Sequence, residues 1–524
     1  MGLSLACLLK QYGLDVAVVE KLPEPAIRTK AAGIWSRSLE MLAQLDLDQT
    51  FAKAGLKSYR ANIFVSGKRA AHLNLDQIPS PYNYVLMLPQ NETERLLNDK
   101  LVSQGVYVKR SWELAELRQD ESGVTLTSAL GESLTADYVV GCDGAQSKVR
   151  QLIGIDFEGT ERPNQWMVAD VVMGGIPWED EILAYVNEHK PLAVFPLGER
   201  TYRIVCEVEE PEGPKDRQQA ELAAKEALSE RIPEKLTIES FRDAGYFRIH
   251  QRQAKQYRQG RVFLAGDSAH VHSPLGGQGM NTGLQDAHNL AWKLACCGKG
   301  LLNSDLLDTY HKERYPVGSG VLKKTGLGTN VLTLRSPIAR HLRDRVLRVA
   351  ANLAPLQNKA RSSLSELDVN YSHSSLSREP RERVSAWSFG KGVAAGYRAP
   401  DGPAKFTSGE EIRLYKLLKG CRFRLLLFGS DNDSGWFNFE PLAKAARRYD
   451  DLLELIWIGA DLQRPLAVDR EHYLMDVTGE LHNQYAATVP CFYLVRPDGY
   501  IACRDLVENV GVLIDYFREL IVKE

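Results

Sequence analysis

Short apolar runs that end in glycine and aspartate are the clearest pattern along this chain. Val262 to Ala265 is such a run and predicts a buried strand, after which Gly266 allows a tight turn and Asp267 stands at the carboxyl end of the strand. Ligands of open α/β sheets bind at that edge. The pattern therefore predicts a ligand site beside Asp267.

A glycine-rich stretch follows this turn and predicts the start of a helix. Pro274 precedes Gly276, Gly277 and Gly279, which leave backbone amides open to a flat or anionic ligand. A carboxylate followed by such amides suits a ribose beside an electron-accepting ring. For a single glycine pair, an ordinary tight connection is the alternative interpretation.

A second apolar run, Tyr138 to Val140, leads into Gly141, Cys142, Asp143 and Gly144. It predicts another strand with an aspartate at its carboxyl end. Taken alone, Asp143 would be a solvated turn residue. Because it repeats the Asp267 pattern, a second contact with the same ligand is favoured.

The amino terminus predicts a helix followed by a strand. Gly2 to Ala6 is typical of a helix start, Val16 to Val19 of a buried strand, and Glu20 follows that strand. Glu20 lies 18 residues after Gly2, near the spacing of roughly 20 between a glycine-rich turn and the acidic residue that binds ribose hydroxyls. Gly2 and Glu20 are therefore candidate nucleotide contacts.

Further strands and a helix are predicted between residues 157 and 253. The strands are Trp166 to Met173, Ala193 to Phe195 and Thr201 to Val208, and a helix lies between Lys215 and Arg231. A sheet here would roof the ligand site and create an apolar cavity, the usual character of small-molecule sites. Trp166, Tyr202 and Arg203 are candidate pocket residues, with sheet packing or surface exposure as the alternative.

The carboxyl-terminal third predicts a helical connection, a linker and a new module. Helical sequence from Pro337 to about Ala360 leads to a Ser-rich stretch, Ser362 to Ser377, which is a candidate linker. After residue 401, Arg424 to Phe428 and Leu452 to Ile458 predict strands, and Thr488 to Val495 is a third apolar run.

Composition agrees with a soluble, multidomain protein of the cytoplasm. The 524 residues suggest about three domains, and 65 basic residues nearly balance 67 acidic ones, so neither nucleic acid nor an anionic membrane is an expected partner. No apolar run of ~18 residues and no basic leader indicate a membrane span or a signal peptide. The eight cysteines lack CxxC or metal-ligand spacing, so we expect reduced thiols and no metal.

These motifs resemble those of the class A flavoprotein aromatic hydroxylases, FAD monooxygenases that include phenol and hydroxybenzoate hydroxylases. The resemblance rests on GRVFLAGDSAHVHSPLGGQGMNTGL (260–284) and DYVVGCDGAQSKVR (137–150), and it continues through DAHNLAWK (286–293) and LLDTYHKERYPVG (306–318). It implies an α/β fold, with a Rossmann-like FAD-binding domain, an inserted β-sheet substrate domain and a thioredoxin-like carboxyl-terminal domain.

The resemblance also implies domain boundaries. The FAD-binding domain would comprise 1–61, 81–158 and 254–334, and the substrate domain 62–80 and 159–253. A helical connection and linker would span 335–384, and the thioredoxin-like domain 385–524. Because the loop from Gly429 to Trp436 has no cysteine, that domain lacks the low-pKa Cys-x-x-Cys of thioredoxins and should be structural or dimer-forming. Pro490 occupies the place of the fold's cis proline.

FAD contacts can be transferred residue by residue from the resemblance. Arg37 matches an arginine near the flavin, and Gln90 matches a glutamine at the pyrophosphate or ribityl region; a surface cation and a helix-start polar residue are the alternatives. No catalytic base is identified, because Ala32 stands where some phenol hydroxylases have an acidic residue. The full set is Gly2, Glu20, Arg37, Gln90, Asp143, Gly144, Asp267, Pro274, Gly277, Gly279, Met280 and Asn281.

The implied reaction is hydroxylation of a small phenolic or polyketide-type aromatic substrate. NAD(P)H would reduce FAD, O2 would add to the reduced flavin at C4a, and the hydroperoxide would pass a hydroxyl group to the ring. Alternatives are a flavin-deficient scaffold that uses its thioredoxin-like domain for assembly, and a flavin halogenase or isoprenoid reductase of the same fold. A plain NAD dehydrogenase is disfavoured because paired aspartate motifs on separate strands are not its signature.

The amino terminus departs from the family pattern. Relatives open with a strand and G-x-G-x-x-G, whereas this chain begins at the last glycine, so we expect it as written to be unstable or short of FAD. We interpret Met1 as an internal methionine of a chain with roughly a dozen further residues, including a strand of ~5 to 6 residues. A truncation that has lost flavin binding is the rival hypothesis.

Overall fold

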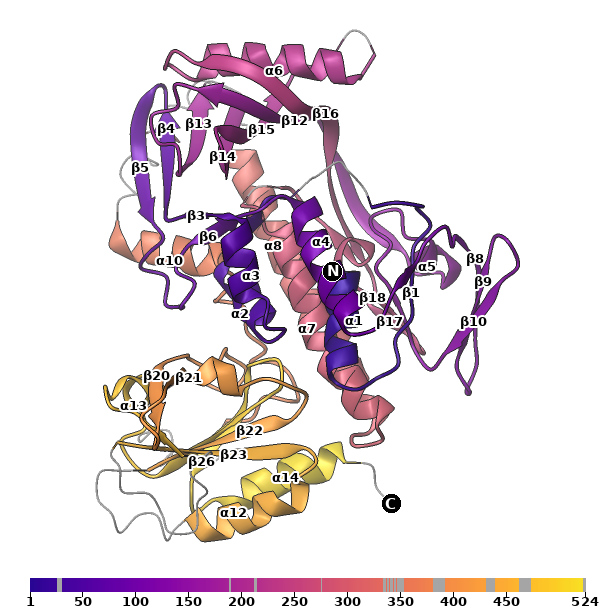
Figure 1. Ribbon diagram of the computed structural model, residues 1–524, viewed down its shortest axis with the longest axis vertical. Coiled ribbons are helices and arrows are strands. Elements are labelled where there is room, and N and C mark those ends of the chain that lie inside the picture. Colours follow the sequence, from indigo (N-terminus) through magenta and orange to yellow (C-terminus); the bar gives the residue numbers. More distant parts are fainter. Residues whose placement is uncertain are drawn as a thin grey trace.

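The computed structural model has three parts that follow one another from top to bottom in Figure 1. It describes residues 1–25, 31–187, 190–211, 214–274, 276–332, 353–379, 392–429, 439–460 and 473–521, with isolated residues between 336 and 345. A large sheet forms the top, short strands and long helices form the middle, and a second sheet forms the bottom.

Short parallel strands and long helices form the middle part. Strand β11 (Val139–Gly141) pairs in parallel with β18 (Val262–Leu264), which pairs antiparallel with β17 (Arg258–Gln259). Strand β1 (Val18–Val19) pairs in parallel with β7 (Val108–Lys109) in a separate two-stranded sheet. The predicted strands around Val18, Val139 and Val262 are therefore present, in two small sheets.

Helices α1 (Gly2–Gln11), α4 (Gln90–Ser103), α7 (Gly279–Gly298) and α8 (Asp308–Leu332) surround these strands. The other helical elements of this part are α2 (Ser36–Ala43), α3 (Asp48–Ala54), α5 (Lys148–Leu152), η1 (Gly266–Ser268) and η2 (Ser304–Leu307). The other strands are β2 (Gly33–Ile34), β3 (Leu56–Ser58), β6 (Val85–Met87), β8 (Leu114–Gln119), β9 (Val124–Ser128) and β10 (Ser133–Ala136).

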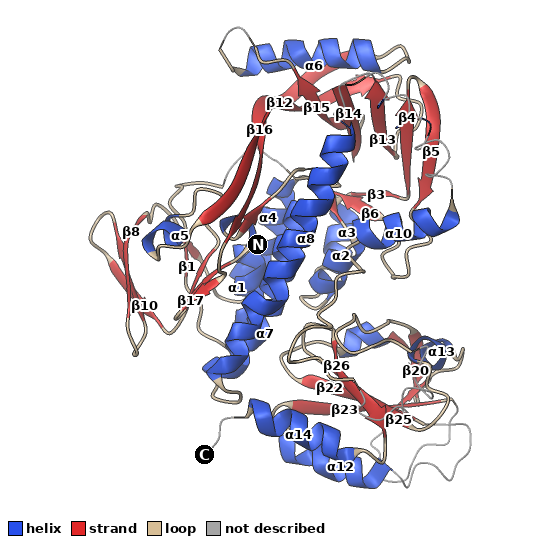
Figure 2. Cartoon of the chain, turned by 180° about the vertical axis from the view of Figure 1, so that it is seen from behind, coloured by secondary structure: helices blue, strands red, loops and turns tan. Residues whose placement is uncertain are grey.

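The large sheet has eight strands in the order β19, β16, β12, β15, β14, β13, β4, β5. Their bounds are β4 (Arg60–Val65), β5 (Lys68–Asn74), β12 (Phe157–Gly174), β13 (Ile182–Asn187), β14 (Lys190–Gly198), β15 (Thr201–Val208), β16 (Thr237–Ala254) and β19 (His270–Val271). Helix α6 (Arg217–Arg231) covers the outer face, as Figure 2 shows. Strands β4 and β5 come from far earlier in the chain than their neighbours and pair through β13.

The carboxyl-terminal part is a seven-stranded sheet in the order β21, β20, β24, β23, β22, β25, β26. Its elements are β20 (Pro403–Phe406), β21 (Glu411–Arg413), η3 (Leu414–Leu417), β22 (Phe423–Phe428), α12 (Glu440–Ala446), η5 (Arg447–Tyr449), β23 (Leu453–Gly459), β24 (Tyr473–Met475), α13 (Glu480–Tyr485), β25 (Cys491–Val495), β26 (Ile501–Leu506) and α14 (Val510–Leu520). Parallel β22 and β23 beside antiparallel β25 and β26 give the expected thioredoxin-like arrangement.

Two expectations for this region are wrong. The peptide bond before Pro490 is trans, since the described chain has no cis peptide; an X–Pro bond is trans unless its surroundings impose the cis form. The Ser-rich stretch 362–377 is not a free linker, because Ser365 and Glu366 near its start are buried and α10 (Ala354–Leu364) runs into it. Most of the loop from Gly429 to Trp436 lies outside the described residues.

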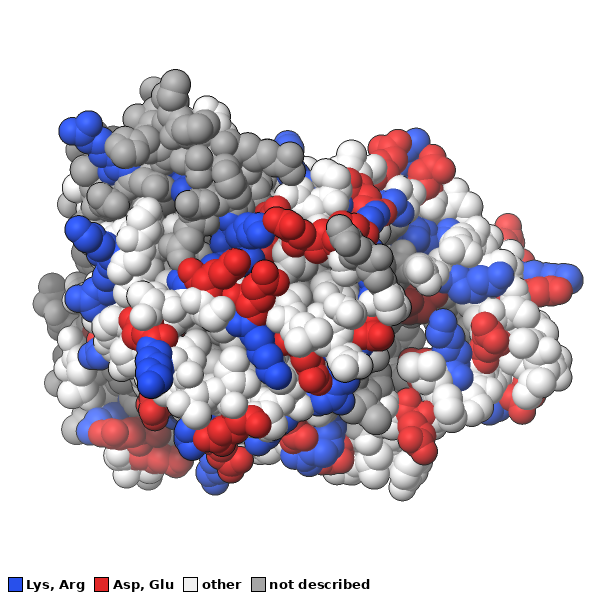
Figure 3. All heavy atoms as spheres, turned by 90° about the horizontal axis from the view of Figure 1, so that it is seen from above, with Lys and Arg blue, Asp and Glu red and all other residues white. Residues whose placement is uncertain are grey.

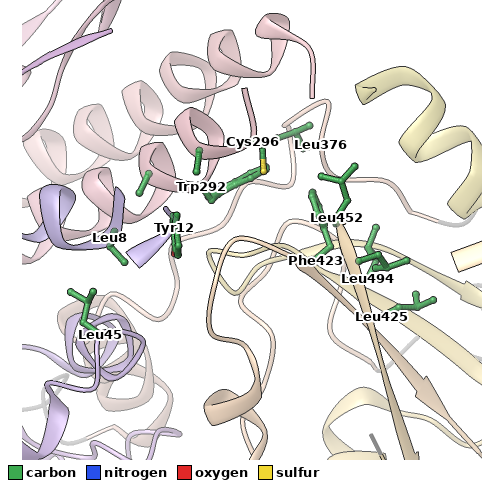
Figure 4. Packing of buried hydrophobic residues seen from close by; sticks show 14 of the residues in the cluster. Leu8, Tyr12, Leu45, Trp292, Cys296, Leu376, Phe423, Leu425, Leu452 and Leu494 are labelled. Atoms are coloured by element: carbon green, nitrogen blue, oxygen red, sulfur yellow. The ribbon is translucent and has the colours of Figure 1, made fainter. Parts of the chain in front are cut away.

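The main core joins the middle and carboxyl-terminal parts. Trp292 and Cys296 of α7 face Phe423 of β22 in Figure 4, and the rings of Trp292 and Phe423 meet edge to face with 5.5 Å between centroids. Leu8 of α1 and Tyr12, which directly follows this helix, belong to the same buried cluster. The carboxyl-terminal sheet is therefore packed against the motif-bearing helix α7.

Charges of both signs alternate on the face above the large sheet, and no single sign dominates it in Figure 3. Among the described helices, none is long and apolar enough to cross a membrane.

Candidate functional site

The two acidic turns lie side by side at one edge of a parallel sheet. Because β11 and β18 pair in parallel, with Gly141 opposite Leu264, the turns that follow them emerge at the same edge. The Ser268 hydroxyl donates a hydrogen bond of 2.6 Å to the Gly141 carbonyl and ties the two turns together. Asp267 is exposed at this edge.

Asp143 also caps a helix. Its carboxylate accepts hydrogen bonds from the Ser147 hydroxyl (2.5 Å) and from the Val149 amide (3.0 Å) at the start of α5. A β-carbon added at the neighbouring Gly144 would meet no heavy atom within 4 Å. The turn thus leaves open space for a ligand beside Gly144.

The glycine-rich stretch opens helix α7 without a capping side chain. Gly276 and Gly277 adopt φ values of +84° and +63°, which only glycine adopts at little cost. No side chain caps the first turn, which begins at Gly279, so its amides are left for an electronegative ligand atom. Pro274 is exposed and Met280 half-buried beside this turn.

Asn281 fastens this helix start to strand β2. Its side-chain oxygen accepts from the Trp35 amide at 2.9 Å, and its Nδ2 donates to the carbonyls of Gly33 (2.9 Å) and Gly277 (2.8 Å). The Trp35 indole donates to the Gly276 carbonyl at 2.9 Å. The glycine turn is therefore held in one position by bonds from both sides.

A buried ionic group supports the Asp267 turn from below. Asp286 accepts hydrogen bonds from the Gly266 amide (2.9 Å) and Arg314 Nε (2.6 Å), and it lies 2.7 Å from His270 Nε2. Although burial raises the pKa of Asp286, Arg314 and His270 outweigh this effect and lower it to about 2. Asp286 therefore stays ionised and fixes the turn.

His272 offers an unused polar atom beside the helix start. Burial and the neighbouring His270 lower the pKa of His272 to about 4, so the ring is neutral. Its Nε2 is buried and has no hydrogen-bond partner in the described chain, and it lies 3.9 Å from the position of a β-carbon at Gly279. A ligand atom at the start of α7 would satisfy it.

The amino-terminal helix starts against the Asp143 turn. A β-carbon added at Gly2 would lie 3.2 Å from Cys142 Cβ, and Met1 Sδ lies 3.7 Å from Cys142 Sγ. Helix α1 has no side-chain cap. At the end of β1, Glu20 accepts a 2.9 Å hydrogen bond from the Leu22 amide.

Two predicted flavin contacts are engaged elsewhere. Arg37 is buried, donates to Glu40 (3.0 Å) and to the Asp498 carbonyl (2.8 Å), and lies 4.9 Å above the Tyr500 ring. These contacts direct its guanidinium to the carboxyl-terminal domain. The side chain of Gln90 is held near the helix start of α4, where it donates to Glu94 (2.7 Å).

The inner face of the large sheet carries a buried ion pair. Arg203 Nε and Nη2 each donate to Asp170 at 2.7 Å, and Nη1 donates to the Ala31 carbonyl at 2.9 Å. The sheet register pairs Arg203 with Asp170. Trp166 is on the same side of β12 by the two-residue alternation of strands and is buried, with its indole nitrogen unpaired in the described chain.

The side chain of Tyr202 lies on the α6 side of the large sheet. It packs in the cluster of Met167, Ile204 and Ala224, which lies between the sheet and α6, and this burial raises its pKa to about 12. Neighbouring residues of a strand point to opposite faces. Tyr202 therefore faces away from the Arg203 side.

An apolar cluster fills the space between the inner face and the middle part. Trp35, Val85 and Met87 form its floor, and Phe195 and Leu197 of β14 pack on it from the sheet. The helix start of α7 adjoins this cluster through the Trp35 indole. A flat ligand at this junction would meet amides on one side and apolar groups on the other.

Sequence reasoning missed several residues that shape the site. Trp35, His270, His272, Asp286 and Arg314 received no role, although His270, His272, Asp286 and Arg314 lie within the strings that carry the resemblance. Strand, turn and helix-start patterns identify the residues that follow a strand at the edge of a sheet. They do not identify buried partners brought from other helices.

A family model described as an FAD binding domain matches residues 1–325. The chain belongs to this family of FAD-dependent aromatic monooxygenases. This monooxygenase is 35% identical to a rifampicin monooxygenase of Streptomyces venezuelae over 393 residues, which cover 73% of the chain and 80% of that relative.

Two full-length similarities extend this finding. Pentachlorophenol 4-monooxygenase of Sphingobium chlorophenolicum is 28% identical over 539 residues, covering 100% of the chain and 95% of that relative. The solved structure of the anhydrotetracycline hydroxylase OxyS from Streptomyces rimosus matches with a TM-score of 0.75 and 29% identity, over 99% of this monooxygenase and 96% of that chain.

The described residues fit FAD. The uncapped starts of α1 and α7, the open space at Gly144 and the orphaned His272 Nε2 are what a diphosphate-linked flavin would occupy and satisfy. Glu20 and Asp267 lie at the ends of β1 and β18, where their carboxylates could accept from its sugar hydroxyls.

Proposed function

We propose that this monooxygenase hydroxylates a phenolic or polyketide-type aromatic compound with NAD(P)H as reductant and O2 as oxygen donor. The observation that carries the proposal is the junction of the α7 start with the apolar cluster under the large sheet. Relatives named for rifampicin, pentachlorophenol and anhydrotetracycline support an aromatic substrate.

FAD, when bound, supplies the redox chemistry by accepting a hydride from the nicotinamide and activating O2. The chain supplies the surroundings. The first amides and the dipole of α7 would stabilise negative charge on the flavin, and the cluster around Trp35 would exclude water. Arg203 is neutralised by Asp170, so this pair would orient a substrate hydroxyl without adding net charge.

Apart from Arg37 and Gln90, whose side chains are engaged elsewhere, the contacts assigned to FAD from the sequence remain part of the proposal. Gly2 and Gly144 would adjoin the diphosphate, Glu20 and Asp267 the sugar hydroxyls, and the turn from Gly277 to Asn281 the flavin. A homodimer through the carboxyl-terminal domain and a cytoplasmic location also stay predictions.

The test begins with the visible absorption spectrum of the purified protein and with heat release of any bound FAD. A panel of phenols is then screened for stimulation of NADH and NADPH oxidation. Bound flavin and a hydroxylated product detected by mass spectrometry would support the proposal. A folded protein that takes up no FAD would support the scaffold alternative, and FAD binding without stimulation by any aromatic would count against hydroxylation.

A matched pair of variants links the activity to the helix start. Gly277→Ala strains a left-handed residue beside the flavin, and we expect at least a tenfold loss of FAD affinity. Gly67→Ala imposes a comparable strain, since Gly67 has φ of +74°, but it lies in the exposed turn between β4 and β5. Equal losses in both variants would mean that the effect is global destabilisation.

A further inference from the structure

The last turn of α10 and the three residues after it tie three elements of the site together. We call residues 361–367 the strap. Gln278 Nε2 donates to the Ser363 carbonyl at 2.7 Å, the Arg37 amide donates to the Ser365 carbonyl at 3.3 Å, and Arg361 donates to the Asn74 carbonyl at 3.2 Å. The strap thus joins the start of α7 to α2 and to β5 of the large sheet.

Glu366 anchors the strap from inside. It is 3% exposed and adopts φ of +58°, a left-handed conformation that is uncommon outside glycine. Its Oε1 lies 2.9 Å from the Thr282 hydroxyl, and its Oε2 accepts from Gln285 Nε2. Within the described chain no salt bridge reaches this carboxyl group.

Hydrogen counting around Thr282 favours a protonated Glu366. The Thr282 hydroxyl lies 3.0 Å from the Gln278 carbonyl and 2.9 Å from Glu366 Oε1. A hydroxyl has one hydrogen, so it cannot donate to both oxygens. A protonated Glu366 resolves this, because its Oε1–H donates to Thr282, which then donates to Gln278, while Oε2 accepts from Gln285.

The charged groups near Glu366 do not offset the effect of burial on its pKa. Arg314 is the facing cation, but its guanidinium is engaged with Asp286, the Tyr371 hydroxyl and the Thr282 carbonyl. Asp368 adds a negative charge from the strap side. Burial is the main cause that raises the pKa of Glu366, to about 8.

We propose that Glu366 is a neutral carboxylic acid in the folded protein and a positioning residue that fixes the strap to the first two turns of the flavin-facing helix α7. It donates one hydrogen bond and accepts one, which an ionised carboxylate cannot do. Loss of its proton would leave an unpaired buried charge beside Thr282 and loosen the start of α7. The inference for flavin binding rests on the proposed function.

The first test compares the thermal stability of Glu366→Gln and the wild type across pH. Unfolded glutamate has a pKa of about 4.3, so the folded protein holds an extra proton between about pH 4.3 and 8 and its stability falls as pH rises through this window. The amide of the variant keeps one donor and one acceptor without a titrating proton. We expect Tm of the variant minus Tm of the wild type to grow by a few degrees from pH 5 to 8 and then level off.

A constant difference from pH 5.5 upward would overturn the proposal, because it would mean that Glu366 is ionised in the folded state. Glu410→Gln removes an exposed carboxylate and serves as the control. Its Tm difference from the wild type should not change with pH. Infrared spectra of the wild type provide a measurement that does not depend on the variant. We expect a protonated-carboxyl band in the wild type that disappears as pH rises through about 8 and that Glu366→Gln lacks. A wild-type spectrum without this band at pH 7 would contradict a neutral Glu366.

The second test measures FAD affinity of the same proteins by fluorescence quenching. We expect the wild type to bind FAD at least severalfold more weakly at pH 9 than at pH 7, and Glu366→Gln to lose this dependence. The same alkaline loss in the variant would overturn the positioning role. If FAD binds at neither pH, the proposed function fails, whereas the thermal and infrared measurements still decide the state of Glu366.

Discussion

Asn281 joins three backbone segments of the flavin site with one side chain. It accepts from Trp35 and donates to Gly33 and Gly277, so it satisfies buried polar groups that a smaller residue would leave unpaired, at about 1–3 kcal/mol each. The sequence predicted this asparagine as a cofactor contact. The structure gives it a second role, which is to hold the glycine turn that would make the contact.

Neighbouring residues of strand β15 show that the sequence does not tell which face of a buried strand meets the ligand. Tyr202 and Arg203 were both candidate pocket residues, and strand alternation requires that they face opposite ways. Because Thr201 to Val208 is buried along most of its length, the pattern does not tell which face meets the ligand. Only helix α6, which covers the Tyr202 side, decides it.

This difference predicts unequal effects of substitution. Arg203→Lys would lose the two-pronged contact with Asp170, and we expect KM for the aromatic substrate to rise about tenfold with FAD affinity unchanged. Tyr202→Phe should change neither value by more than about twofold. Steady-state kinetics and flavin titration measure both, and a larger effect of Tyr202→Phe would place the substrate on the α6 side.

At the scale of elements, local sequence patterns predicted which strands form better than they predicted how long those strands are. The prediction placed a strand at Trp166 to Met173, whereas β12 has 18 residues and pairs with β16 of equal length. Polar residues such as Glu158 and Glu161 lie in its first part, where long-range pairing rather than composition keeps the chain extended. The strap was missed for the same reason, since its contacts come from distant elements.

Helices α7 and α8 depend on their buried ion pair. Arg314→Met would leave Asp286 charged in the core with only His270 beside it, and we expect a loss of about 3–5 kcal/mol in the free energy of unfolding. Lys255→Met breaks a pair with Asp156 and Glu158 that is half exposed, so it should change the free energy of unfolding far less. Chemical denaturation of the two variants tests this contrast, and similar losses would contradict it.

At the scale of the whole molecule, the carboxyl-terminal domain is bound to the rest by charge as well as by apolar packing. Arg496 donates to Glu313 of α8 through both terminal nitrogens, at 2.7 and 2.9 Å, and Lys293 of α7 donates to the same carboxylate at 2.8 Å. Arg398 pairs with Glu40 of α2. The sequence predicted the domain and its lack of redox cysteines, but these buried partners lie far apart in the chain and have no local signature.

We therefore expect these two parts to unfold together. Arg496→Met should leave Glu313 short of a partner and separate the calorimetric transition of the carboxyl-terminal domain from that of the FAD-binding part. Arg448→Met, on the exposed surface of the same domain, should leave the profile unchanged. Two resolved transitions already in the wild type would show that the domains unfold independently.

Helix α7 connects the glycine-rich turn at its start to the carboxyl-terminal domain. Its first turn would face the flavin under the proposed function, and Asn289 and Trp292, further along, donate to Asp498 of the carboxyl-terminal domain. Asn281 and Trp292 are about 17 Å apart along the axis at 1.5 Å per residue. A directed-evolution screen for altered catalysis should accordingly recover substitutions around Asp498, far along the helix from its first turn.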